Sequence, residues 1–131
     1  SNVYDRWPAY AASVDAAQAA LAPLVEQAGH RIFYGCGLTF WWVLLITAGR
    51  AARDAWLIDD SPASWGLWAP TYSVEIIKPG AECFDGHPTV ILTLSMVYHA
   101  RAIERLREYG RAMTVVRLSA GRIERLELDG R

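Results

Sequence analysis

Two glycines on either side of a cysteine form the strongest chemical signal in this sequence. Phe33-Tyr34-Gly35-Cys36-Gly37 lies between a short apolar segment typical of a strand and a longer one typical of a helix. Glycines at such a turn let the phosphates of a ligand approach the backbone, and the free N–H groups of the following helix attract anions. The alternative is that the glycines only turn the chain sharply. The residues expected to contact a ligand here are Gly35, Cys36, Gly37, Leu38 and Thr39.

Two acidic residues follow the next expected strand. Asp59 and Asp60 come roughly twenty residues after the glycine turn, where an acidic residue of a dinucleotide-binding fold often hydrogen-bonds ribose hydroxyls. The other interpretation is a solvated turn. Both interpretations stay open at this stage.

A third polar group follows a later apolar run, Thr89 to Leu94. It consists of Thr93, Ser95, Tyr98 and His99. Ser95 is expected to cap a helix, so that two helix N-termini converge on one crevice, which suits a diphosphate. His99 is a candidate acid or base, although a single histidine in a first helical turn is more often a structural hydrogen-bonding group.

The elements that position these residues alternate along the chain. Residues 1–12 are expected to be an irregular lead-in, followed by a helix that Asp15 caps, that Pro23 kinks and that ends at Gly29. Further helices are expected at 38–53, apolar nearly all round and therefore buried on more than one face, and at 96–109. Strands are expected at 30–34, 54–58, 73–77, 89–94, 112–118 and 123–128.

This order predicts an α/β fold: a three-layer, Rossmann-like, open and mostly parallel sheet with strand order 3-2-1-4-5. The last two strands are expected to form an antiparallel hairpin. Residues 1–131 are expected to form one domain, and the initial Ser1-Asn2 is consistent with a piece of a longer protein. Strands one and four would be neighbours at the switch point, so the Gly35 and Ser95 turns would share one pocket.

Composition excludes several classes of protein. The 131 residues carry a net charge of -1 and are 53% hydrophobic, which argues against disorder and against nucleic-acid binding. Cys36 and Cys83 give neither a disulfide framework nor a zinc pattern, so we expect no metal site and a cytoplasmic location. The uncharged run 32–49 just reaches membrane-spanning length, but Gly35 and Gly37 interrupt it, so no membrane association is expected.

Tryptophans and arginines allow further interpretations. Trp41, Trp42, Trp65 and Trp68 belong either to the core or to an interface with a second copy or a neighbouring domain. The segment with Arg101, Arg105, Arg107 and Arg111, interleaved with Glu104 and Glu108, is typical of a solvated helix face with ion pairs. No base is near Cys36 in sequence, which favours a packing role for this thiol over a nucleophilic one.

Several short motifs together resemble the carboxy-terminal Rossmann-like domain of the sugar-nucleotide C-methyltransferases. The resemblance covers roughly residues 14–118. The matching segments are Phe33-Tyr34-Gly35-Cys36-Gly37, Leu57-Ile58-Asp59-Asp60-Ser61, Gly66, Val90-Ile91-Leu92-Thr93, Val97-Tyr98, Ile103, Leu106, Gly110 and Val115-Val116. The bulky Thr39-Phe40-Trp41-Trp42 departs from the small or polar residues usual after the turn.

The resemblance implies binding of a nucleotide or nucleotide sugar, positioned for a separate domain that binds S-adenosylmethionine. Because neither that domain nor its zinc-binding cysteines occur here, methyl transfer by this chain alone is not expected. Two other classes remain open. One is a fragment of an NAD(P)-dependent oxidoreductase, against which Phe40 counts because it occupies the position of the third fingerprint glycine. The other is a non-catalytic interaction module that dimerises through its tryptophans around a vestigial pocket.

Overall fold

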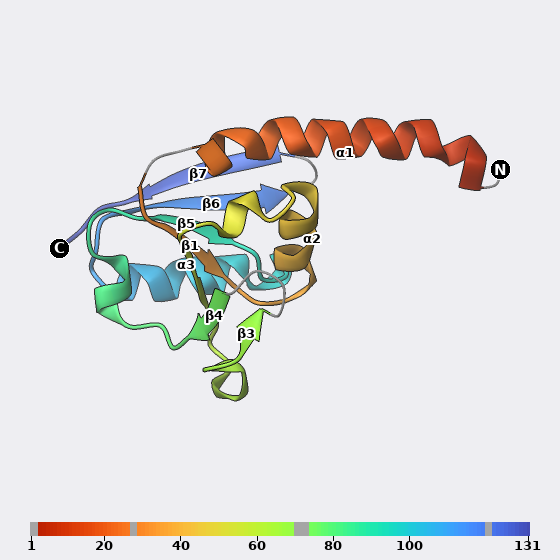
Figure 1. Cartoon of the computed structure of the whole chain (residues 1–131). Coiled ribbons are helices and arrows are strands. Elements are labelled where there is room, and N and C mark those ends of the chain that lie inside the picture. The colour runs from red at the N-terminus through yellow and green to blue at the C-terminus, as the bar shows by residue number, and fades with distance from the viewer. Residues whose placement is uncertain (1–2, 27–28, 70–73, 120–121) are drawn as a thin grey trace.

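A twisted seven-stranded sheet forms the centre of the protein (Figure 1). The computed structural model describes residues 3–26, 29–69, 74–119 and 122–131. Its strands are β1 (Arg31–Tyr34), β2 (Ala55–Ile58), β3 (Trp68–Ala69), β4 (Val74–Ile77), β5 (Thr89–Leu92), β6 (Met113–Ser119) and β7 (Arg122–Leu128). Its helices are α1 (Val3–Glu26), α2 (Leu38–Ile46) and α3 (His99–Glu108), with 3-10 turns η1 (Arg50–Ala52), η2 (Pro62–Ser64), η3 (Ala81–Phe84) and η4 (Met96–Tyr98).

The strand order confirms the predicted fold. The sheet runs β3-β4-β2-β1-β5-β6-β7, and β4, β2, β1, β5 and β6 are parallel to one another. Without the two-residue β3, this is the order 3-2-1-4-5-6 of an α/β, Rossmann-like sheet. β6 and β7 form the expected antiparallel hairpin, with Met113 opposite Leu128 and Ser119 opposite Arg122. β3, which pairs antiparallel with β4, was not predicted.

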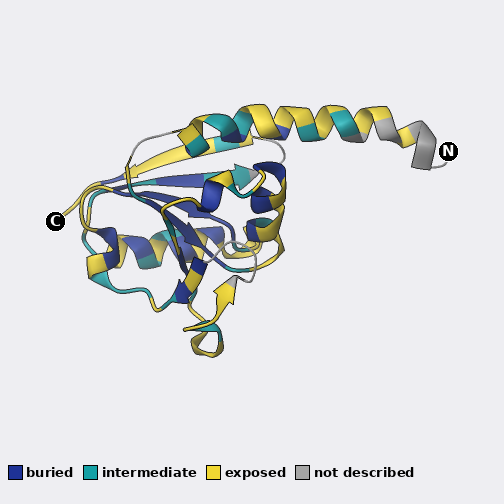
Figure 2. Cartoon of the chain, in the orientation of Figure 1, coloured by how far each residue is buried: buried dark blue, intermediate teal, exposed yellow. Residues whose placement is uncertain are grey.

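Alternate side chains of each strand enter two separate cores, one on either face of the sheet. Phe33, Leu57 and Ile91 pack against α1, α2 and η1. Ile32, Val90 and Leu92 lie on the other face, where α3 and η3 cover them. β1 and β5 are buried along their whole length because helices cover both faces, which explains the apolar runs Ile32–Tyr34 and Val90–Leu92 (Figure 2).

The expected irregular lead-in at residues 1–12 is wrong for residues 3–12, and residues 1–2 lie outside the described part of the chain. α1 begins at Val3 and continues to Glu26 through Pro8 and Pro23, so Asp15 lies within the helix rather than at its N-cap, and Pro23 does not divide it into two helices. Each proline removes one backbone hydrogen bond. The packing of Ala17, Leu21 and Leu24 in the first core stabilises the helix around the second one.

α2 is shorter and less buried than the sequence predicts. It ends at Ile46, because Ala48 and Gly49 both adopt positive φ angles, of 51° and 78°, and break the helix before η1. Only one face of α2 packs on the sheet, through Phe40, Val43, Leu44 and Ile46. Its remaining apolar residues are exposed, so the expectation of burial on more than one face is wrong.

A buried arginine fixes the end of α1 to the sheet. Arg31, at the start of β1, donates hydrogen bonds to the carbonyls of Leu24 (3.1 Å), Val25 (2.7 Å) and Arg53 (2.5 Å). Two of these carbonyls belong to the last turn of α1, where the helix dipole favours a cation. Arg31 therefore connects α1, β1 and the segment that leads into β2.

None of the helices in the described part of the chain combines the length and the apolar character needed to cross a membrane.

Candidate functional site

The backbone segments that follow β1 and β5 lie in close contact. Gly35 has a φ of +112°, and a Cβ atom built there would lie 2.5 Å from the backbone nitrogen of Leu94. The hydroxyl of Thr93 donates a hydrogen bond to the Gly35 carbonyl (2.6 Å), and the Thr93 and Leu94 N–H groups both bond the Tyr34 carbonyl. Thr93 is fully buried. The backbones that follow β1 and β5 are therefore in direct contact at Gly35 and Leu94.

Asp59 fastens the glycine turn instead of facing solvent. Its carboxylate accepts hydrogen bonds from the Cys36 N–H (3.1 Å), the Cys36 thiol (3.2 Å) and the Ser61 N–H (2.8 Å). Burial, and then the hydrogen bond to Asp59, raise the pKa of the Cys36 thiol. Cys36 is thus held as a neutral thiol, in line with the packing role expected for it.

The start of α2 lies outside the hollow described below. Gly37 is its N-cap residue, with no side-chain cap, and Leu38 is 88% exposed. Thr39 is half-buried, and Phe40 packs edge-on against Phe33 with 5.3 Å between ring centroids. The aromatic pair therefore fills the space that a small residue leaves open in a dinucleotide-binding turn.

A groove lies on the other side of Gly35, toward α3. Its volume is about 260 Å³, and its lining residues are Tyr34, Gly35, Asp59, Asp60, Leu94, Tyr98, Arg101, Ala102 and Arg105. A second, more open hollow continues past Asp60 and Arg105 to Glu108 and Tyr109. The groove thus runs from the ends of β1 and β2 along one side of α3. The groove alone is slightly smaller than the volume of about 300–1,000 Å³ usual for small-molecule sites, and the second hollow extends it.

Asp60 organises the floor of this groove. Its Oδ2 accepts hydrogen bonds from the Tyr34 hydroxyl and from Nη1 of Arg105 (2.5 Å for the latter). Burial, and then the hydrogen bond to Asp60, raise the pKa of Tyr34 well above its usual range. Tyr34 therefore remains a protonated donor, which holds the Asp60 carboxylate in place for Arg105. Both charged partners are about two-fifths exposed, so their ion pair is accessible to a ligand.

Within the described residues, the side chains of Arg101 and Tyr98 line the groove without an ion pair or a hydrogen bond of their own. Among the described residues, none forms an ion pair or a side-chain hydrogen bond with the Arg101 guanidinium. Arg105 uses one of its nitrogens for Asp60, which leaves N–H donors on the others. Tyr98 lines the groove and is 56% exposed. The groove therefore combines two guanidinium groups and two carboxylates with an aromatic side chain.

Ser95 and His99 lie near the groove but do not line it. Ser95 is exposed and precedes η4 without a side-chain capping bond, and the helix α3 begins only at His99. His99 is buried, with its Nε2 3.2 Å from the Leu94 carbonyl, which makes Nε2–H a hydrogen-bond donor. Burial lowers the pKa of His99. These contacts fit the structural role of a neutral imidazole.

The lowered pKa of His99 predicts that acid reduces the stability of the folded protein. Because its pKa is lower in the folded protein than the ordinary 6.5, the unfolded chain binds the proton more readily, and stability must fall as the pH drops below about 6.5. His30, whose pKa burial also lowers, adds to the effect. Urea unfolding at pH 7.5 and 5.5 should show the loss, and His99→Gln, which keeps a donor but does not titrate, should show a smaller one. An equal loss in wild type and variant would contradict this role of His99.

The sequence pointed to Gly35, Asp59, Asp60 and Tyr98, which do line the groove, but it missed Arg101, Arg105 and Tyr34. The arginines were assigned to a solvated face of ion pairs within one helix. Arg105 and Arg111 instead pair with Asp60 and Asp85, which belong to other segments. The sequence does contain a pattern that could have indicated these arginines. Tyr98, Arg101 and Arg105 follow the end of a strand at the spacing of one helix face.

Fold and groove together define an α/β protein of Rossmann-like topology with a groove at the carboxyl ends of its strands, lined by two arginines and two aspartates. No family model matches the chain, and neither the curated proteins nor the solved structures provide a match. Within the described residues, no group of three histidine, cysteine, aspartate or glutamate side chains is arranged to hold a metal ion.

Proposed function

We propose that this chain binds a nucleotide or a nucleotide sugar in the groove between β1, β2 and α3. The observation that carries the proposal is the unpaired Arg101 guanidinium, which shares a groove of about 260 Å³ with Arg105 and the exposed ring of Tyr98. A guanidinium is the side chain best suited to hold phosphate through two parallel hydrogen bonds.

Each lining group has a role in this proposal. Arg101 and the free N–H groups of Arg105 hold the phosphates. Tyr98 stacks on the base or on the sugar ring, a contact that is tolerant of the kind of base. Asp60, fixed by Tyr34, accepts hydrogen bonds from ligand hydroxyls through the oxygen that neither Tyr34 nor Arg105 uses.

In this proposal the phosphates bind in the groove and not at the glycine turn, where the sequence alone predicts them. Asp59 already satisfies the Cys36 N–H, which leaves one backbone donor fewer for a diphosphate at the start of α2. Together with the Phe33–Phe40 pair, this contact disfavours the alternative of a dinucleotide bound as in NAD(P)-dependent oxidoreductases. Gly37, Leu38 and Thr39 consequently have no part in the proposed site.

The proposal assigns binding rather than catalysis to this chain. The resemblance to the sugar-nucleotide C-methyltransferases suggests that a separate domain with S-adenosylmethionine would act on the bound sugar. Positioning of the substrate is then the contribution of this chain.

Replacement of Arg101 with Ala should weaken binding of UDP-glucose about 30-fold, since a hydrogen bond to a charged group contributes about 1.5–3 kcal/mol. Calorimetric titration measures this loss. Arg107→Ala is the matched control, because Arg107 is exposed on the same helix but does not line the groove. Equal affinity of wild type and the Arg101 variant, or no binding of nucleotides and nucleotide sugars by wild type, would overturn the proposal.

The substitution Gly37→Asp tests whether the ligand binds in the groove or at the glycine turn. A side chain at Gly37 would meet nothing within 4 Å, and its φ of −81° suits any residue, so the variant should fold normally. We expect its affinity for UDP-glucose to remain within about twofold of wild type, because the added charge lies outside the groove. Loss of binding in this variant would return the phosphates to the start of α2.

A further inference from the structure

β7 is a long edge strand with an open outer side. It is the last strand of the sheet and pairs with β6 in an unbroken register, from Leu128 opposite Met113 to Arg122 opposite Ser119. Residues 124–127 are all exposed, so no other described element covers this stretch (Figure 2). β3, at the opposite edge of the sheet, has only two residues. An edge strand as long and regular as β7 is a template on which another strand can pair.

The hydrogen bonds of β6 show which backbone groups of β7 point outward. The Thr114 N–H donates to the carbonyl of Pro88, which lies on the β5 side of β6. The backbone groups of successive residues in a strand point to opposite sides, so those of Val115 face β7 and bond its partner Leu126. The two neighbours of Leu126 in β7 therefore direct their N–H and C=O groups away from the sheet.

The charges of β7 are complementary to a second copy of the same strand. When two copies of an edge strand pair antiparallel about a two-fold axis, one residue lies opposite its own copy at the axis. With Leu126 at the axis, Arg125 of each copy lies opposite Glu127 of the other. Opposite charges directly across two strands stabilise the pairing, and like charges destabilise it. An axis at any charged residue of β7 would instead place two like charges opposite each other.

The two remaining registers are less favourable. An axis at Leu128 would place Glu127 opposite Asp129, which are both acidic. An axis at Ile123 avoids like charges, but because β7 begins at Arg122 it would pair only residues 122–124 of the strand. The register with Leu126 at the axis overlaps residues 124–128 of both copies, which is about the length of an ordinary strand.

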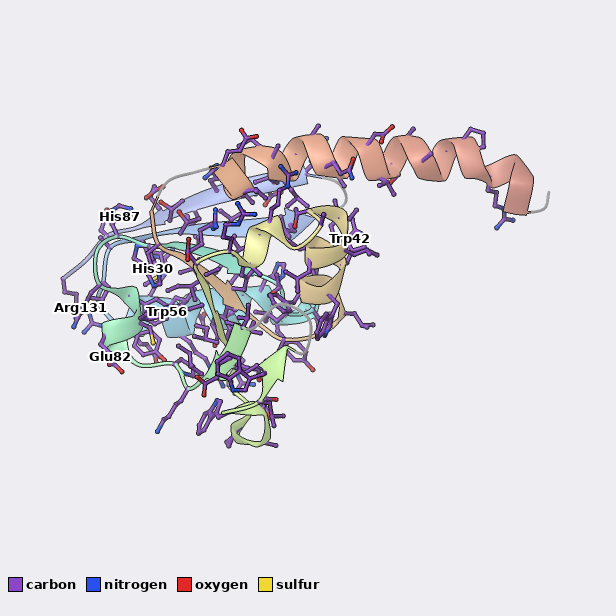
Figure 3. The ribbon with its side chains drawn as sticks, viewed as in Figure 1. His30, Trp42, Trp56, Glu82, His87 and Arg131 are labelled. Atoms are coloured by element: carbon purple, nitrogen blue, oxygen red, sulfur yellow. The ribbon has the colours of Figure 1, made fainter. Side chains whose placement is uncertain are left out.

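The two charged residues are positioned for such a pair. Thr114 donates a hydrogen bond to the Glu127 carboxylate (2.8 Å), and His87 lies 3.2 Å from its other oxygen, beside the end of β7 (Figure 3). The Glu127 side chain is nevertheless 60% exposed, so lone pairs remain for a partner. Within the described residues, no ion pair engages the Arg125 guanidinium. Each chain thus offers an ordered acceptor and an available donor at the matching positions.

We propose that two copies of this chain pair through the outer side of β7, antiparallel and with Leu126 at the two-fold axis, so that their sheets become one continuous sheet. Arg125 and Glu127 supply the backbone hydrogen bonds that join the strands, and their side chains form an ion pair on either side of the axis. The two Leu126 side chains, each 36% exposed in the single chain, meet on the other face of the sheet. The interface is independent of the ligand groove, because β7 does not line it.

Hydrogen exchange tests whether the outer side of β7 is the contact. Sedimentation equilibrium from micromolar to submillimolar concentration should show a monomer and a dimer. Over the same range, the amides of Arg125 and Glu127 should become protected from exchange at least about tenfold, because pairing occupies them. The amide of Leu126 is the internal control, since it bonds β6 and should be protected at every concentration.

Charge reversal tests the register. Arg125→Glu places two carboxylates opposite each other on both sides of the axis and should raise the dimer dissociation constant about 30-fold. Glu127→Arg should do the same with two guanidinium groups, and an equimolar mixture of the two variants should associate about as tightly as wild type. Arg122→Glu is the matched control, since it makes the same change of charge on β7 outside the overlap. Circular dichroism should show all three variants folded, because each replaced side chain is exposed in the single chain.

A wild-type chain that stays monomeric at the highest concentration would overturn the proposal. So would a dimer in which the Arg125 and Glu127 amides exchange as fast as in the monomer, since the contact would then lie elsewhere. An Arg125→Glu chain that dimerises like wild type would contradict the register with Leu126 at the axis.

Discussion

Gly35→Ala should destabilise the protein by about 3–5 kcal/mol, the sum of a disfavoured backbone conformation and an overpacked contact. The added methyl group would lie 2.5–2.9 Å from the backbone nitrogen, Cα and Cβ of Leu94, and the φ of +112° is one that residues other than glycine rarely adopt. Leu94 cannot easily move away from the added methyl group, because the Thr93 and Leu94 N–H groups both donate hydrogen bonds to the Tyr34 carbonyl. Urea unfolding, or the absence of folded protein, measures the effect.

Substitutions at two other glycines distinguish the cost of the positive φ angle from the cost of the steric contact. Gly66 has a φ of +82° but open space around it, so Gly66→Ala should cost only about 1 kcal/mol. Gly37 has neither restriction, so Gly37→Ala should leave the stability almost unchanged. A Gly35→Ala protein whose stability is within about 1 kcal/mol of wild type would show that the contact between Gly35 and Leu94 can relax, which would contradict the tight packing of the two strand ends.

Arg31→Ala should lower the free energy of unfolding by about 3 kcal/mol. The substitution removes three hydrogen bonds to the carbonyls of Leu24, Val25 and Arg53 and leaves these groups without their partner. Two of the three lie in the last turn of α1, so amide hydrogen exchange should accelerate in α1 more than in α3.

Arg53→Ala is the control for this experiment. The Arg53 side chain is exposed, and the substitution leaves its carbonyl in place for Arg31. The control should be as stable as wild type within about 0.5 kcal/mol. Equal stability of the Arg31 and Arg53 variants would contradict the anchoring of α1 by Arg31.

The sheet was predictable because its strands are short, apolar and separated by clear turns. In β5, burial on both faces of the sheet selects the apolar run Val90–Leu92. The helix ends were less predictable. Ala48 breaks α2 with a positive φ that its residue type does not indicate, and the packing of Leu21 and Leu24 sustains α1 around Pro23 against local preference.

The candidate site was predictable only in part, for a physical reason. The sequence indicated which strand ends meet, but not that Asp59 would fasten the glycine turn or that Thr93 would fill the gap between β1 and β5. Both are contacts between side chains and backbone far apart in the chain. They hold the ends of β1 and β5 together, and the groove lies beside them toward α3, whose arginines look like ordinary surface residues in the sequence.

The central claim is that the groove beside α3, rather than the glycine turn, binds phosphate-containing ligands. The most direct test is a titration of isotope-labelled protein with UDP-glucose, followed by amide and arginine side-chain NMR signals. We expect saturable shifts at Gly35, Leu94, Tyr98 and at the guanidinium groups of Arg101 and Arg105, with little change at Leu38 and Thr39. Shifts confined to the start of α2, or no saturable shifts at all, would contradict the account.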